Sequence, residues 1–147
     1  MSRDLILYAH IGLGIIIAIA FIWVLIEARN RSFRDSKNAG LAGAIAAWLT
    51  LIIGGYYYLT FYPPIKTLIL AHAWPWAHEI LMETKEHWIF ILAPFATLLA
   101  LMMWKAGPQA MKNEEMRKFV MTGSKIIIVI TLAIAVMGRL ISMAGLS

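Results

Sequence analysis

Most residues of this chain that can carry chemistry lie in one short stretch, HAWPWAHEILMETKEHWIF, at residues 72–90. The stretch holds three of the four histidines and three of the eight carboxylates, and it separates two long apolar runs. A plain turn between membrane helices needs no titratable group. Imidazoles and carboxylates ligate metals and haem iron and transfer protons. The stretch therefore predicts a redox or metal site.

The composition places this site in a membrane. The chain is 61% hydrophobic and 14% charged, whereas soluble domains carry about 25% charged residues. Four apolar runs reach the roughly 20 residues that a membrane-spanning helix requires. The predicted fold is all-α, an integral membrane four-helix bundle with up-down antiparallel order. Residues 1–147 would form a single transmembrane domain with helices at about 5–28, 39–61, 76–105 and 122–146.

Prolines and small residues predict the limits and the packing of these helices. Pro63 and Pro64 are expected to end the second helix, and Pro75 is expected to open the third. Ala39, Gly43 and Ala47 recur every four residues, a spacing that lets two helices approach closely. We interpret this last pattern as packing alone.

The basic residues predict a topology. Nine of the 13 lysines and arginines fall in or beside the first and third connectors. Cytoplasmic loops are rich in Lys and Arg, so both termini and residues 72–90 should lie outside a cytoplasmic membrane that the chain crosses several times. The net charge of +5 forms no continuous stripe, and nucleic acid is therefore not an expected partner. The expected partner is the lipid bilayer.

Two histidines fall at the same expected depth. Counted from the basic connectors at 1.5 Å per residue, His10 and His87 both lie about 27 to 29 Å into the membrane. In an up-down bundle their helices are diagonal, so two imidazoles could ligate one b-type haem from both faces. The absence of cysteine excludes covalently attached c-type haem and iron–sulfur clusters. The remaining predicted haem-binding residues are Gly14, as part of a groove that also includes Ala18, Tyr57 from the tyrosine cluster at residues 56–58, and Lys85 and Arg139 as propionate partners.

The third helix carries two further patterns. His78, Met82 and Glu86 repeat every four residues and share one face, and Glu79, Glu83 and His87 share the adjoining face. Imidazole, thioether and carboxylate groups can bind copper, and imidazole with carboxylate can bind zinc. The alternative hypothesis is therefore a copper- or zinc-binding or transport protein that uses His78, Met82, Glu83 and His87, with His10 as a further ligand. His72 and His78 are a second candidate pair of haem ligands.

The leading functional hypothesis is an electron carrier or the membrane anchor subunit of a redox complex, rather than an enzyme acting alone. It would bind haem between His10 and His87 near the outer face and exchange electrons with quinone or an extracytoplasmic partner. Tyrosines and tryptophans near the outer face are typical of membrane interfaces, and they could also form a quinone headgroup pocket. A third hypothesis is a cofactor-free accessory subunit, which binds partner subunits or forms a homo-oligomer.

Overall fold

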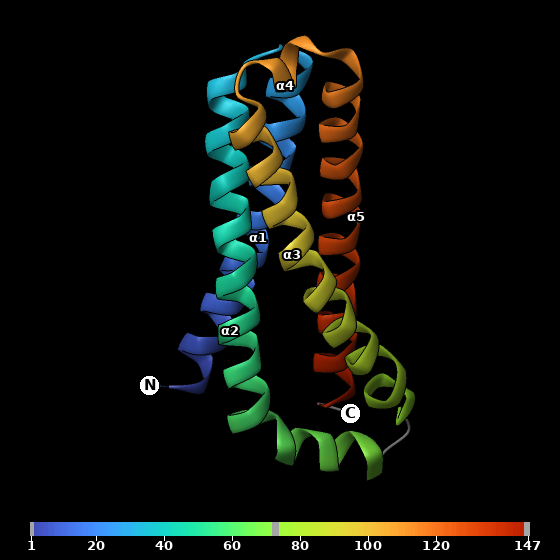
Figure 1. The fold of residues 1–147 in the computed structure, drawn as a ribbon. Coiled ribbons are helices and arrows are strands. Elements are labelled where there is room, and N and C mark those ends of the chain that lie inside the picture. Colours follow the sequence, from blue (N-terminus) through green and yellow to red (C-terminus); the bar gives the residue numbers. More distant parts are fainter. Residues whose placement is uncertain (1, 72–73, 146–147) are drawn as a thin grey trace.

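The computed structural model describes residues 2–71 and 74–145, and within these ranges all regular structure is helical (Figure 1). The expected all-α fold is thus confirmed for this part of the chain. The helices are α1 (Arg3–Arg29), α2 (Phe33–Ala71), the π-helix η1 (Ala77–Met82), α3 (Glu83–Ala106), α4 (Gln109–Lys112) and α5 (Glu114–Ala144). Helix η1 continues directly into α3. Four helical stretches are long and apolar enough to cross a membrane: α1, α2, η1 with α3, and α5.

The long helices pack side by side as a bundle. Helix α1 packs against α2 and α5, and α3 packs against the same two helices. Figure 1 shows the start of α1 and the end of α5 at one end of the bundle and the connector from α1 to α2 at the other. The larger buried cluster joins α1, α2, α3 and α5 through residues such as Phe21, Ala47 and Leu99. A smaller cluster around Tyr62, Ile69 and Ile141 closes the opposite end.

Helix α2 does not end at its prolines, and that prediction is wrong. Pro63 and Pro64 lie inside the helix, which continues to Ala71. A proline removes a backbone donor and its ring displaces the preceding turn, so it bends a helix rather than necessarily stopping it. In Figure 1 the last part of α2 turns across the end of the bundle. Burial of Ile69 in the smaller cluster holds this bent segment in place.

The other helix limits agree with the sequence to different degrees. Helix α1 lies within two residues of its prediction, and the combined helix of η1 and α3 lies within one. Helix α5 begins eight residues before position 122, because its first five residues include four charged side chains and lie outside the apolar run. Asn113 caps this start by accepting hydrogen bonds from the amides of Glu115 and Met116, at 2.9 and 3.1 Å.

Small residues let α1 and α2 approach closely, as the four-residue spacing predicted. Gly43 and Ala47 are buried, and Ala39 packs against the larger cluster. A Cβ atom on Gly43 would lie 2.7 Å from Cε2 of Phe21 and 3.1 Å from Cβ of Ala20. The predicted packing role is therefore confirmed.

Substitution Gly43→Ala is expected to destabilise the protein by about 1–3 kcal/mol, because the added methyl group overpacks the contact with Phe21. The matched control is Gly12→Ala in α1, where a Cβ atom would meet nothing within 4 Å. Unfolding in mixed detergent micelles, followed by circular dichroism, measures the stability of both variants. Equal midpoints for the two variants would contradict this account of the α1–α2 contact.

Candidate functional site

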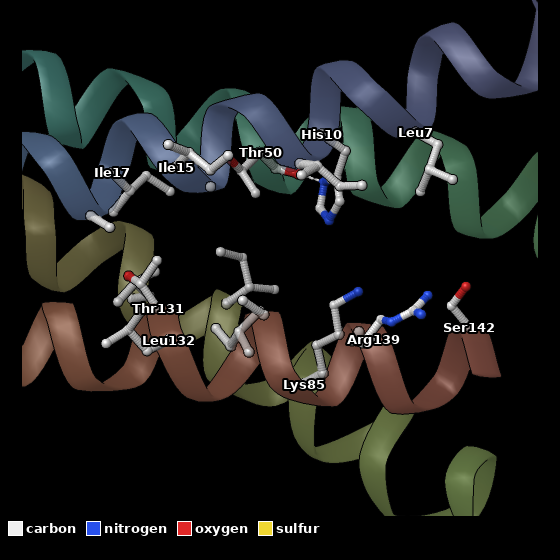
Figure 2. A pocket seen from close by; sticks show the side chains of 18 of the residues that line it. Leu7, His10, Ile15, Ile17, Thr50, Lys85, Thr131, Leu132, Arg139 and Ser142 are labelled. Carbon is white, nitrogen blue, oxygen red and sulfur yellow. Dashed lines mark hydrogen bonds between the residues drawn. The ribbon is translucent and has the colours of Figure 1, made fainter. Parts of the chain in front are cut away.

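The bundle contains an apolar cavity of about 580 Å³ (Figure 2). All four long helices contribute to its lining, and each supplies at least one polar side chain. The polar and charged lining residues are His10 from α1, Thr50 from α2, Lys85 from α3, and Thr131, Arg139 and Ser142 from α5. Cofactor and ligand sites commonly have volumes of about 300–1,000 Å³ and a few polar groups in an apolar wall. We refer to this space as the first cavity.

His10 has a fixed orientation in the first cavity. Its Nδ1 lies 3.2 Å from the backbone carbonyl oxygen of Thr50. A carbonyl can only accept a hydrogen bond, so Nδ1 carries the proton and Nε2 is left with a free lone pair. Figure 2 shows the imidazole directed into the space between the helices. This arrangement presents Nε2 to any molecule that occupies the cavity.

Gly54 makes room for this imidazole. A Cβ atom at position 54 would lie 2.6 Å from Cε1 of His10 and 2.9 Å from Nδ1. Real side chains do not approach that closely, so His10 can lie against α2 only because residue 54 has no side chain. Gly14, one turn after His10, also lines the cavity, and a Cβ atom there would meet nothing within 4 Å. Gly14 therefore widens the cavity rather than packing it.

Two cationic side chains line the first cavity. Lys85 comes from α3 and points toward His10, whereas Arg139 comes from α5 and extends along that helix toward Ser142 (Figure 2). Neither forms an ion pair with any carboxylate that the structure describes. Cationic groups at membrane depth are costly and need a partner. The cavity thus suits an apolar molecule with anionic or acceptor groups at one edge.

His87, the predicted second haem ligand, lies elsewhere. It is exposed, its Nδ1–H donates to the carbonyl oxygen of Glu83 at 2.7 Å, and it does not line the first cavity. Lys85 and Ile89, two residues to either side, both line that cavity. Successive residues turn by 100° around a helix, so a residue two positions from each of these points away. The structure brings together His10, Gly14, Lys85 and Arg139 but leaves His87 outside.

A second cavity of about 510 Å³ adjoins the first and shares the polar residues His10, Thr50, Lys85 and Ser142 with it. Its own polar lining comes from Arg3, Tyr57, Tyr58, Tyr62 and Glu86. The predicted site residue Tyr57 therefore lies here. Glu86 was expected only as part of the helix face that it shares with His78 and Met82, and Tyr62 only as one of the outer tyrosines that could form a quinone headgroup pocket.

The residues of the metal alternative do not converge. His78 is buried and its Nδ1 lies 3.2 Å from the hydroxyl of Tyr62, whereas Glu83 and His87 are exposed. Within residues 2–71 and 74–145, no group of three or more His, Asp or Glu side chains is placed to hold a metal ion. His72, the other candidate ligand, lies outside the described residues.

Comparison with known proteins adds no further constraint on the site. No protein family, curated protein or solved structure matches this chain. The function is therefore inferred from the side chains that line the two cavities.

Proposed function

We propose that this chain is a membrane-integral electron-transfer protein, or the membrane anchor subunit of a redox complex, and that it binds a b-type haem in the first cavity through His10. The observation that carries the proposal is the hydrogen bond from Nδ1 of His10 to the Thr50 carbonyl oxygen. Histidines that ligate a metal almost always donate the other ring N–H to a carbonyl, a carboxylate or water. Nε2 of His10 is then the ligand atom, and it faces the cavity.

The rest of the cavity fits a haem. Its volume of about 580 Å³ lies in the range of cofactor sites, its wall is apolar, and the open space beside Gly14 leaves room along α1. Lys85 and Arg139 supply the charge that two propionates need. A bound haem would supply one-electron chemistry. The protein would fix the ligand, exclude water and set the redox potential through burial and the two cations.

The proposal assigns one axial ligand from the described residues, since His87 points away from the cavity. The sequence, through the matched depths of His10 and His87, predicted two histidine ligands instead of one. A reduced haem with one protein ligand keeps an open coordination position. Carbon monoxide should therefore bind it readily, whereas a haem held by two imidazoles should not.

The proposal includes a topology for the membrane. We place the helices in up-down antiparallel order, with both termini outside the cytoplasmic membrane. Support comes from the start of α1 and the end of α5, which lie at one end of the bundle (Figure 1), and from the basic connectors at the other. His10 and Lys85 would then lie in the outer half, within reach of an extracytoplasmic redox partner. Quinone in the bilayer would be the partner inside the membrane.

An absorption spectrum of the detergent-purified protein tests the haem proposal. We expect a Soret band, α and β bands after reduction with dithionite, and a shifted Soret band when carbon monoxide is added to the reduced protein. About one haem per chain should be found by pyridine haemochrome assay. A flat visible spectrum, from cells supplied with a haem precursor and after addition of haemin, would refute the proposal. Normal haem content without a response to carbon monoxide would instead favour two strong axial ligands.

A further inference from the structure

The second cavity opens toward lipid on its apolar side. Leu59 and Phe90 line it and are 76% and 64% exposed, so their side chains meet the hydrocarbon of the membrane. Leu68 lines it as well and is also exposed. A molecule could therefore enter from the bilayer without crossing a polar surface. This favours a lipid-soluble ligand over a solute from water.

The inner part of the same cavity is polar and incompletely hydrogen-bonded. Oε1 of Glu86 is buried and accepts no hydrogen bond of full geometry from the described residues, although the side chain of Tyr58, which lines the same cavity, lies close to this carboxylate. A buried carboxylate oxygen without a donor is costly, and a ligand that donates a hydrogen bond removes that cost. Glu86 therefore calls for a donor group on the ligand. A phosphate or carboxylate headgroup would bring a second negative charge beside it and is disfavoured.

Two tyrosines lie in this polar part. The rings of Tyr58 and Tyr62 are stacked, with centroids 5.1 Å apart. The hydroxyl of Tyr62 lies 3.2 Å from Nδ1 of His78, and both side chains are buried. The pair offers an aromatic surface next to hydroxyl groups, and it connects the cavity to His78 at the start of the third membrane helix. An aromatic ring that carries hydroxyl groups can stack on it.

We propose that the second cavity binds the headgroup of a membrane-soluble quinol, with a quinol hydroxyl donating to Glu86 and the hydrocarbon tail leaving past Leu59 and Phe90. This inference rests on the proposed haem function for its electron acceptor, because the two cavities share His10 and Lys85. Oxidation of a quinol to a quinone breaks two O–H bonds and releases two protons and two electrons. A haem held by His10 would supply the one-electron chemistry that accepts these two electrons in turn, and a one-electron carrier protein outside the membrane would be the final oxidant.

The protons have separate acceptors in this arrangement. The Glu86 carboxylate takes the first directly. The second reaches the Tyr62 hydroxyl, which in turn passes its own proton to Nδ1 of His78 when that nitrogen is unprotonated. No side chain is oxidised, and each residue is restored when its proton leaves.

Photoaffinity labelling with an azido-substituted benzoquinol, kept reduced under argon, tests the site in the full-length protein. Peptides are mapped by mass spectrometry, and decylubiquinol is the competitor. We expect labelling of α2 and α3 around Leu59 and Phe90 that decylubiquinol abolishes. Substitution Glu86→Ala should raise the half-maximal competitor concentration about ten- to hundredfold, because a hydrogen bond to a charged group is lost.

The matched control is Glu79→Ala, which removes an exposed carboxylate from η1 that lines neither cavity. If Glu86→Ala folds poorly, Glu86→Gln keeps the volume and should show a smaller weakening in the same direction, since its acceptor is neutral. Labelling that decylubiquinol does not compete, or equal affinities of the Glu86 and Glu79 variants, would overturn the proposal.

Failure of the quinol site is distinguishable from failure of the haem site, because the labelling needs no haem. Labelling of a haem-free His10→Ala protein that decylubiquinol abolishes would support the quinol site, whatever the absorption spectrum of the native protein shows. A haem spectrum together with labelling that decylubiquinol does not abolish would support the proposed haem function and refute the quinol site.

Discussion

Replacing His10 by alanine is expected to remove haem from the purified protein, whereas replacing His87 by alanine should leave the haem content unchanged. His10 presents Nε2 to the first cavity while Nδ1 is held by the Thr50 carbonyl oxygen. His87 is exposed and its Nδ1 is bonded within its own helix. Haem per chain, measured by pyridine haemochrome assay, should fall at least tenfold in His10→Ala, because the iron loses its protein ligand.

Three controls make this pair of variants decisive. Both should insert into the membrane and elute as the native protein does on gel filtration, since neither residue belongs to a buried core cluster. Imidazole added to His10→Ala should restore part of the Soret band by filling the vacated position. Loss of haem in His87→Ala to the same extent as in His10→Ala would contradict the single-ligand arrangement and favour the diagonal pair.

The helices were predictable from the sequence where apolar length alone decides them. α1 and the helix of η1 with α3 lie within two residues of their expected limits, because about 20 apolar residues in lipid leave no other way to satisfy the backbone. α2 was predicted too short at both ends. The polar turn before residue 39 continues the helix, and burial of the segment after Pro64 depends on tertiary contacts that no local pattern reveals.

The depth of a residue was easier to predict than the direction of its side chain. Helical rise placed His10 and His87 at one level, but a count of rise contains no angle around the helix axis. The sequence did separate two faces of the third helix without indicating which one is buried. In the structure His78 and Met82 are buried and Glu86 lines the second cavity, while Glu79, Glu83 and His87 are exposed.

Close contacts between helices could not be predicted from the sequence. The role of Gly54 depends on how α1 rotates against α2, and one glycine in an apolar run gives no indication of this. Its neighbour Gly55 has the same residue type, and only the three-dimensional arrangement distinguishes them. A Cβ atom at Gly54 meets the His10 imidazole, while one at Gly55 meets nothing within 4 Å.

This difference leads to the second large expected effect. Substitution Gly54→Ala places a methyl group where the His10 ring now lies, 2.6 Å from Cε1 and 2.9 Å from Nδ1. The ring must rotate away, and its hydrogen bond to the Thr50 carbonyl oxygen is lost. Loss of an outer partner of a metal-ligating histidine typically lowers metal affinity about 10- to 100-fold. Gly54→Ala should weaken haem binding by about this factor although it removes no ligand.

Gly55→Ala is the matched control, because it makes the same chemical change one residue further along α2. Its haem affinity, measured by transfer of haem to apomyoglobin, should equal that of the native protein. Equal haem loss from both variants would mean that α2 tolerates no added methyl group in this region, and the contact with His10 would then not be the cause. Loss confined to Gly54→Ala would tie haem retention to the orientation of one imidazole, because the ligand atoms, the cationic side chains and the cavity wall are unchanged in that variant.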